Sequence, residues 1–140
     1  MHREIPTKFC PIFPNTKYKT PLKRREFILT IDNIKEEIYN AESIIILTHE
    51  MPDGDAIGSS LAMYNGLKSL GKNVEVVMAN NSAVFDFLPG ASEIRTEGSK
   101  TVYDLAIALD CGDIKRLNGY TEYFENANAR IEIDHHGINT

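Results

Sequence analysis

Residues 43–58 read SIIILTHEMPDGDAIG, and this stretch decides the fold. It begins with a short β-branched run, Ser43 to Thr48, of the kind that forms a strand buried on both faces of a sheet. The turn Pro52-Asp53-Gly54 then starts a helix that Gly71 ends. Apolar residues at helical spacing support that helix, namely Ile57, Leu61, Tyr64, Leu67 and Leu70.

On both sides of this stretch the chain alternates helix and strand. Upstream, a helix is predicted over Thr30 to Ala41, with Thr30 as its N-terminal cap. Downstream, the pattern predicts a strand over Val74 to Met78, a short extended piece over Ala83 to Leu88, a strand over Val102 to Leu109, a brief helix over Thr121 to Asn126 and a last strand over Ala129 to Ile133. Such alternation implies right-handed βαβ crossovers. We therefore predict an α/β fold, a three-layer βαβ structure whose parallel sheet has helices on both faces.

The composition limits the class of protein. With 140 residues, of which 42% are hydrophobic, the chain makes one domain at most. No apolar run approaches the roughly 20 residues that cross a membrane, and the N-terminus has no secretory signal pattern. Cys10 and Cys111 are too few for a disulfide framework. These features predict a soluble protein of the reducing cytoplasm with no membrane partner.

Charge divides the chain into two segments. Residues 1–26 carry seven Lys or Arg against two acidic residues, whereas residues 27–140 carry eight against eighteen. We interpret residues 1–26 as a basic, poorly ordered N-terminal arm and residues 27–140 as the folded part. The alternative is an arm that binds nucleic-acid phosphates through its basic side chains, which include Lys17, Lys19, Lys23, Arg24 and Arg25.

Acidic and imidazole side chains follow three of the predicted strands. They are His49, Asp53 and Asp55 after the first strand, Asp110 after the strand that ends at Leu109, and Asp134, His135 and His136 after the last strand. In parallel sheets ligands bind beyond the carboxyl ends of the strands, so these side chains are expected to meet. Together they offer enough ligands for two divalent metals about 3.5–4 Å apart. That arrangement is typical of phosphate-ester hydrolysis.

Each of these residues also has a structural explanation when taken alone. Asp53 and Asp55 could belong to an ordinary turn and helix cap, and His49 could be a hydrogen-bonded core residue. Ala56 stands where an EF-hand would need further oxygen ligands, and the chain has no glycine-rich phosphate loop. The adjacent His135 and His136 would be costly to bury without partners, and this favours a cluster that binds cations.

The motifs resemble those of a known family. The run His49-x-x-x-Asp53-Gly54-Asp55-Ala56-Ile57-Gly58-Ser59, Asp110 with Arg116 after it, and Asp134-His135-His136 closely resemble the first three motifs of the DHH phosphoesterases. That superfamily includes RecJ exonucleases, nanoRNase/pAp phosphatases of NrnA type, cyclic-dinucleotide phosphodiesterases and, more remotely, family II inorganic pyrophosphatases. Gly58-Ser59-Ser60-Leu61, Phe87-Leu88-Pro89-Gly90 and Ala108-Leu109-Asp110 look most like the nanoRNase/pAp phosphatase branch. The resemblance covers about residues 30–140.

The resemblance implies a role for each site residue. It suggests that His49 and Asp53 bind one metal, that Asp55 and His135 bind the other, and that Asp110 bridges both. Mixed imidazole and carboxylate ligands suit Mn²⁺ better than Mg²⁺, with Co²⁺ a further option. The resemblance makes His136 and Asp134 catalytic, with His136 against the substrate phosphate and Asp134 orienting an imidazole. It also suggests that Arg116 binds phosphate, although Arg116 could equally be a surface residue.

The implied function is manganese-dependent hydrolysis of short oligoribonucleotides or of 3′-phosphoadenosine 5′-phosphate (pAp), with a homodimer open for the full-length form. Alternatives are hydrolysis of cyclic dinucleotides or pyrophosphate at the same metals, a non-catalytic fragment that binds metal or nucleotide, and, remotely, a thiol hydrolase using Cys111 and a histidine. Family members continue to a further metal-binding aspartate and a second domain. We therefore expect this chain to be the amino-terminal part of an enzyme, without that second domain and weakly active or inactive alone.

Overall fold

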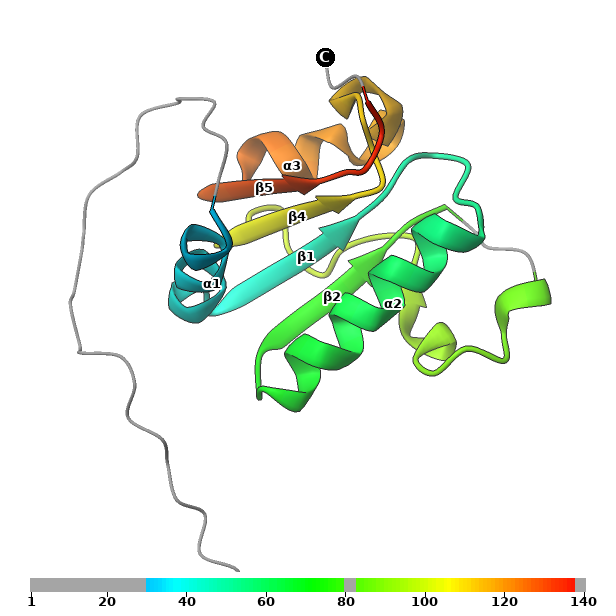
Figure 1. The fold of residues 1–140 in the computed structure, drawn as a ribbon, viewed down its shortest axis with the longest axis horizontal. Coiled ribbons are helices and arrows are strands. Elements are labelled where there is room, and N and C mark those ends of the chain that lie inside the picture. The colour runs from blue at the N-terminus through cyan, green and yellow to red at the C-terminus, as the bar shows by residue number, and fades with distance from the viewer. Residues whose placement is uncertain (1–29, 80–82, 138–140) are drawn as a thin grey trace, which may run out of the picture.

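The computed structural model describes residues 30–79 and 83–137 and contains a five-stranded sheet (Figure 1). All paired strands are parallel, and their order across the sheet is β3-β2-β1-β4-β5. The strands are β1 (Ser43–Leu47), β2 (Asn73–Val77), β3 (Ile94–Arg95), β4 (Leu105–Leu109) and β5 (Ala129–Ile133). The predicted α/β fold with a parallel sheet is confirmed.

The strand order reverses at β1. From β1 the chain continues to β2 and β3 on one side, and it returns to the other side for β4 and β5. Leu47, the last residue of β1, pairs with Val77 of β2 and with Ala108 of β4. The carboxyl ends of these three strands therefore lie level at one edge of the sheet, and a ligand is expected at the crevice where the order reverses.

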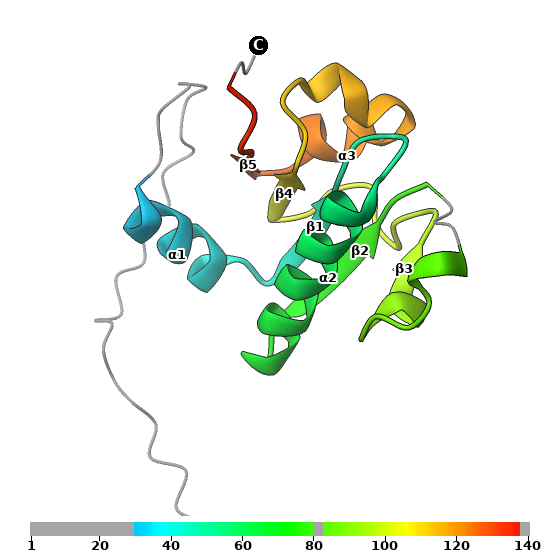
Figure 2. The ribbon, with the colours of Figure 1, turned by 45° about the vertical axis from the view of Figure 1, so that its right-hand side comes forward.

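Helices cover both faces of the sheet, as predicted. On one face lie α1 (Ile31–Asn40) and α2 (Gly54–Ser69), which pack on one apolar cluster, and on the other lie a 3₁₀ segment, Ile114–Tyr120, and α3 (Thr121–Asn126), which pack on a second (Figures 1 and 2). β1 supplies both clusters, because its successive side chains point to opposite faces. Ile44 and Ile46 face α2, whereas Ile45 and Leu47 face the 3₁₀ segment and α3.

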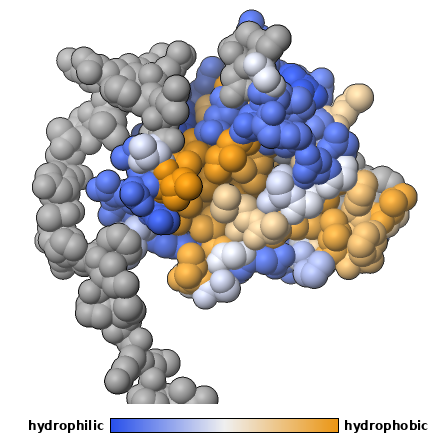
Figure 3. Space-filling model, in the orientation of Figure 1, coloured by the Kyte–Doolittle hydropathy of each residue, from blue (hydrophilic) through white to orange (hydrophobic). Residues whose placement is uncertain are grey.

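The surface follows the same layout. Seen from the side of α2, apolar side chains reach the surface in the middle of the face, beside α1, and hydrophilic ones cover the part nearest the strands' carboxyl ends (Figure 3). Among the described residues, no helix has the length and apolar character needed to cross a membrane. The predicted boundary at residues 26 and 27, the basic side chains of the arm and Cys10 all lie outside the described residues.

The helix caps hold the predicted ends in place. Thr30 caps α1 through a capping box with Asn33, and Asp53 caps α2 by accepting hydrogen bonds from the backbone N–H groups of Asp55 and Ala56. Gly71 has a φ of 76°, a left-handed conformation that favours glycine after a helix. Asp53 is therefore both a cap and a candidate ligand.

Four details differ from the predictions. The stretch Ala83 to Leu88 is not extended, because its first residues form a 3₁₀ turn, Ala83–Phe85. The strand expected from Val102 starts only at Leu105. Leu70 lies beyond the end of α2 and is 72% exposed, so it does not belong to the core face. β3 has only two residues and was not predicted, since so short a strand shows no alternation.

Candidate metal centre

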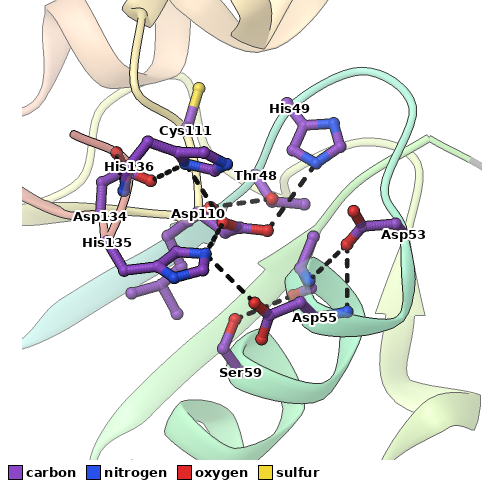
Figure 4. A network of polar contacts seen from close by, with 12 residues as sticks. Thr48, His49, Asp53, Asp55, Ser59, Asp110, Cys111, Asp134, His135 and His136 are labelled. Atoms are coloured by element: carbon purple, nitrogen blue, oxygen red, sulfur yellow. Dashed lines mark hydrogen bonds and ion pairs between the residues drawn. The ribbon is translucent and has the colours of Figure 1, made fainter. Parts of the chain in front are cut away.

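The candidate site lies at the carboxyl ends of three strands. His49 follows β1, Asp110 follows β4, and Asp134 with its two histidines follows β5 (Figure 4). The buried hydroxyl of Thr48 donates a hydrogen bond of 2.8 Å to the carbonyl of Leu109, which ties the ends of β1 and β4 together. The sequence prediction that these segments converge is confirmed by their placement.

Asp110 lies at the centre of the site. Its side chain is 7% exposed, and its Oδ1 is buried without a hydrogen-bond partner among the described residues. Oδ1 is 3.3 Å from Nε2 of His135, and Oδ2 is 4.0 Å from Nε2 of His49. A buried carboxylate with an unsatisfied oxygen is costly unless a cation or donor reaches it. The surroundings of Asp110 therefore fit a bound metal.

The backbone of Asp110 adopts a strained conformation at the turn after β4. Its φ is 54°, in the left-handed region that non-glycine residues rarely adopt, although aspartate tolerates it better than most. Its N–H donates to the carbonyl of Ile133 at 3.0 Å, so the turn after β4 stays attached to β5. Strain of this kind often occurs at functional sites. The turn presents the carboxylate to ligands from both neighbouring loops.

Two groups of potential ligand atoms share Asp110. In one group His49, Asp53 and Asp110 have ligand atoms within 4.8 Å of one another, and in the other Asp110, His135 and His136 do. Asp55 adjoins the second group, because its Oδ2 is 3.3 Å from Nε2 of His135. Imidazole nitrogens together with carboxylate oxygens suit transition metals such as Mn²⁺. All five residues expected to bind metal thus lie together.

Only one oxygen of the Asp53 carboxylate takes part in capping α2. Oδ1 accepts both cap hydrogen bonds, from Asp55 and Ala56, each at 3.0 Å. The hydrogen bond from Ala56 is the main cause that holds the pKa of Asp53 below its usual value. The carboxylate therefore stays ionised, and Oδ2 is the oxygen that can bind a cation.

Asp134 and His136 form a tight pair beside the centre. The Asp134 side chain is 0% exposed, with Oδ1 2.6 Å from Nδ1 of His136 and Oδ2 accepting the backbone N–H of His136 at 3.1 Å. The hydrogen bond to Asp134 raises the pKa of His136. Burial acts to raise the pKa of Asp134, but the hydrogen bonds from His136 outweigh it and lower that pKa. The pair fixes the imidazole ring and leaves Nε2 for another partner.

A cavity of about 290 Å³ opens next to His135. Polar groups of Asp55, Ser59 and Asp110 line one side, and Leu109 and Ile133 give it an apolar side. Sequence reasoning did not assign Ser59, Leu109 or Ile133 to the site, although each lies within four residues of a residue that it did assign. Another cavity, of about 270 Å³, lies away from this centre around the ion pair of Glu75 and Arg95.

Arg116 and Cys111 are the two remaining candidates from the sequence analysis. Arg116 is exposed on the 3₁₀ segment and outside both ligand groups, while its charge acts to lower the pKa of His136. Its proposed contact with phosphate stays a prediction. Cys111 is fully buried, its Sγ donates to the carbonyl of Asp113, and burial raises the pKa of its thiol. A thiol hydrolase needs an accessible thiolate, so Cys111 does not fit that role.

Comparisons with known proteins find similar sequences and a similar fold. The family model described as "DHH family, N-terminal domain" matches residues 43–140. A bifunctional oligoribonuclease and PAP phosphatase NrnA from Thermus thermophilus is 42% identical over 98 residues, which cover 69% of this chain and 28% of that protein. The protein of the same name from Mycoplasma genitalium is 30% identical over 97 residues, which cover 68% of this chain and 30% of that protein.

Among solved structures, an exopolyphosphatase-related protein from Bacteroides fragilis has a similar fold. The TM-score is 0.71 at 30% sequence identity, and the match covers 79% of this chain and 35% of that one. The chain thus spans about a third of the length of the proteins that it matches.

Proposed function

Because the chain belongs to the DHH family, we propose that it supplies the metal centre of a phosphoesterase that hydrolyses short oligoribonucleotides or pAp. The observation that carries this proposal is the buried carboxylate of Asp110, whose Oδ1 has no hydrogen-bond partner among the described residues and which two groups of potential ligands share. Asp110 is suited to bridge two cations because its two oxygens face different histidines.

The proposed ligands divide between the two sides of Asp110. His49 and the free Oδ2 of Asp53 would hold one Mn²⁺, and Asp55 with Nε2 of His135 would hold the other. Two such ions, when bound, lower the pKa of a water and neutralise charge on a phosphate. Their position at the reversal of strand order is where α/β proteins commonly bind substrates.

Asp134, His136 and Arg116 would act on the substrate. Asp134 holds Nδ1 of His136, so that Nε2 can give a hydrogen bond or a proton to the phosphate. Arg116, on the neighbouring 3₁₀ segment, would add a positive charge for a second phosphate oxygen. A proton donor held in this way contributes about 10²–10⁴-fold to rate.

The names of the relatives support the choice of substrate. Both curated relatives are described as an oligoribonuclease and PAP phosphatase, whereas the solved structure is described as exopolyphosphatase-related. About two thirds of each relative lies outside the matched region, so recognition of the whole substrate is proposed to involve parts other than the residues described above. Pyrophosphate and cyclic dinucleotides stay alternative substrates for the same metals.

The test is a substrate panel with Mn²⁺ present. This chain alone should release phosphate from pAp or mononucleotides from a short RNA weakly or not at all. A chimera in which residues 43–140 replace the matched region of the Thermus thermophilus relative should release them readily, and Asp110→Asn should abolish that release. Release from pyrophosphate alone, or from a cyclic dinucleotide alone, would support the alternatives. Tight manganese binding without turnover of any substrate, in the chimera as well as in this chain, would contradict a phosphoesterase and indicate a binding protein.

A further inference from the structure

Glu50, the neighbour of His49, makes two contacts with a distant part of the chain. Its backbone N–H donates to the carbonyl of Arg116 at 2.9 Å. Its carboxylate accepts a hydrogen bond from the side-chain amide of Asn118. Both contacts cross from the loop after β1 to the 3₁₀ segment after β4. They join the loop that carries His49 to the segment that carries Arg116.

Asn118 adopts an unusual backbone conformation to make its contact. Its φ is 46° and its ψ is −115°, and the 3₁₀ segment kinks there. A non-glycine residue in such a region costs about 1–3 kcal/mol unless its surroundings stabilise it. Glycine would adopt this conformation at less cost, and yet the amide that reaches Glu50 would then be missing. The kink itself therefore does not require asparagine, and what Asn118 adds is the side-chain amide that binds Glu50.

The loop between β1 and α2 has one fixed point at each end. The hydroxyl of Thr48 is bound to the end of β4, and Asp53 is bound as the cap of α2. Between them His49 is buried at 5% exposure, whereas the next two residues, Glu50 and Met51, are exposed, Met51 at 79%. Glu50 gives this exposed part its attachment to the 3₁₀ segment. That attachment adjoins His49, whose Nε2 lies 4.0 Å from Oδ2 of Asp110.

We infer that Glu50 and Asn118 are positioning residues that hold His49 and the Arg116 segment in place around the metal centre. This inference rests on the proposed function only for the identity of the ion that His49 binds. Loss of the contact should let the loop move and place His49 less often beside Asp110. The measurable effect is weaker metal binding without loss of the fold.

The test compares four variants with the wild-type protein. Asn118→Gly relieves the backbone strain and removes the amide, so its melting temperature should be unchanged or higher while Mn²⁺ affinity falls about threefold to tenfold. Glu50→Ala should weaken binding equally, and Glu50→Gln, which keeps an oxygen acceptor, should restore it. Asn128→Ala is the matched control, because it removes an amide contact of 3.2 Å with Asp104 at the opposite end of the sheet. That control should leave Mn²⁺ affinity unchanged.

A second readout keeps the inference separate from the proposed function. In the protein without metal, the ¹⁵N signals of the His49 ring should shift or broaden in Asn118→Gly and Glu50→Ala but not in Asn128→Ala. Unchanged His49 signals and unchanged affinity in Asn118→Gly would overturn the positioning role. Equal losses in Glu50→Gln and Glu50→Ala would also overturn it, since charge would then be the cause. If the wild-type protein binds no metal, the proposed function fails and the His49 signals still decide the positioning role.

Discussion

Nε2 of His135 lies 3.3 Å from Oδ1 of Asp110, although the two residues follow different strands. The contact depends on the register of the sheet, in which Leu109 of β4 pairs with Ile133 of β5. The turn after each strand then brings the side chains together above the sheet edge. This contact places a carboxylate where water hardly reaches it. When no cation is bound, the buried charge therefore lowers the stability of the folded protein.

Replacing Asp110 should therefore stabilise the protein without metal. Asp110→Asn keeps the size and removes the buried negative charge, so the free energy of unfolding should rise by about 1–3 kcal/mol at pH 8 in the presence of a chelator. Thermal unfolding measures this directly. Manganese should then stabilise the wild-type protein and not the variant. A lower melting temperature for Asp110→Asn under chelation would contradict this cost and show that the neighbouring His49 and His135 already compensate the buried charge.

Asp104 should contribute stability that disappears in acid. It accepts hydrogen bonds from the backbone N–H and the hydroxyl of Ser43, each at 2.9 Å. Burial acts to raise the pKa of Asp104, but the hydrogen bonds, with that of the Ser43 hydroxyl the strongest, lower it. Its contribution is thus present above the unfolded value of about 3.9 and is lost as the pH falls through the lower folded pKa.

The variant Asp104→Ala tests this contribution. It should lose about 1–3 kcal/mol at pH 7, because the buried Ser43 N–H is left without an acceptor. The difference from the wild-type protein should shrink below about pH 4. Asp32→Ala is the control, since the contact of Asp32 with Lys35 is exposed and should be worth less than about 1 kcal/mol. A difference that stays constant from pH 7 to pH 3 would show that ionisation of Asp104 is irrelevant.

Two glycines should respond in opposite directions to alanine. Gly66 is exposed in the last turn of α2 with nothing within 4 Å of an added Cβ, so Gly66→Ala should stabilise by up to about 0.5–1 kcal/mol. At Gly98 an added Cβ would lie 2.6 Å from the hydroxyl of Tyr103, which is itself bound to Glu75. Gly98→Ala should lower the denaturation midpoint in urea. Equal midpoints for the two variants would contradict the packing around Tyr103.

The elements that sequence predicted well are those bounded by clear changes in polarity. The strand Ala129–Ile133, in which Ile131 is buried, and the helix Thr121–Asn126, in which Phe124 is buried, have the predicted bounds, and the polar triplet after Ile133 marks the end of the strand. The site residues were found because they follow such runs, and parallel strands bring their carboxyl ends to one edge.

Contacts between distant segments were not predictable in the same way. Asn118 and Glu50 are 68 positions apart, and no spacing in the sequence indicates that they pair. The 3₁₀ turn at Ala83 and the kink at Asn118 depend on tertiary packing rather than on local pattern. Tyr103 is buried outside any strand because its hydroxyl reaches Glu75, a partner 28 positions away. Periodicity identifies elements, and it does not show how the loops between them interlock.

Metal binding and hydrolysis should separate at His136. If His136 contacts phosphate rather than metal, His136→Ala should keep the Mn²⁺ affinity of this chain within about threefold. In the chimera with the Thermus thermophilus relative it should lower the rate on pAp or short RNA by about 10²–10⁴-fold. Asp134→Asn should have a smaller effect, because the ring remains present but less firmly held. Parallel calorimetry and single-turnover kinetics make the comparison. Loss of one manganese ion in His136→Ala would instead make His136 a ligand, as its place beside Asp110 and His135 allows.

Asp110 is proposed to bridge two metal ions, and paramagnetic resonance of the manganese-loaded protein tests this bridge most directly. The wild-type chain should bind two Mn²⁺ ions and give a spin-coupled spectrum, since a shared carboxylate places the ions about 3.5–4 Å apart. Asp110→Ala removes a ligand from both ions and should abolish the coupling and most of the binding. A wild-type spectrum of isolated ions, or manganese binding that Asp110→Ala leaves unaltered, would contradict the two-metal centre.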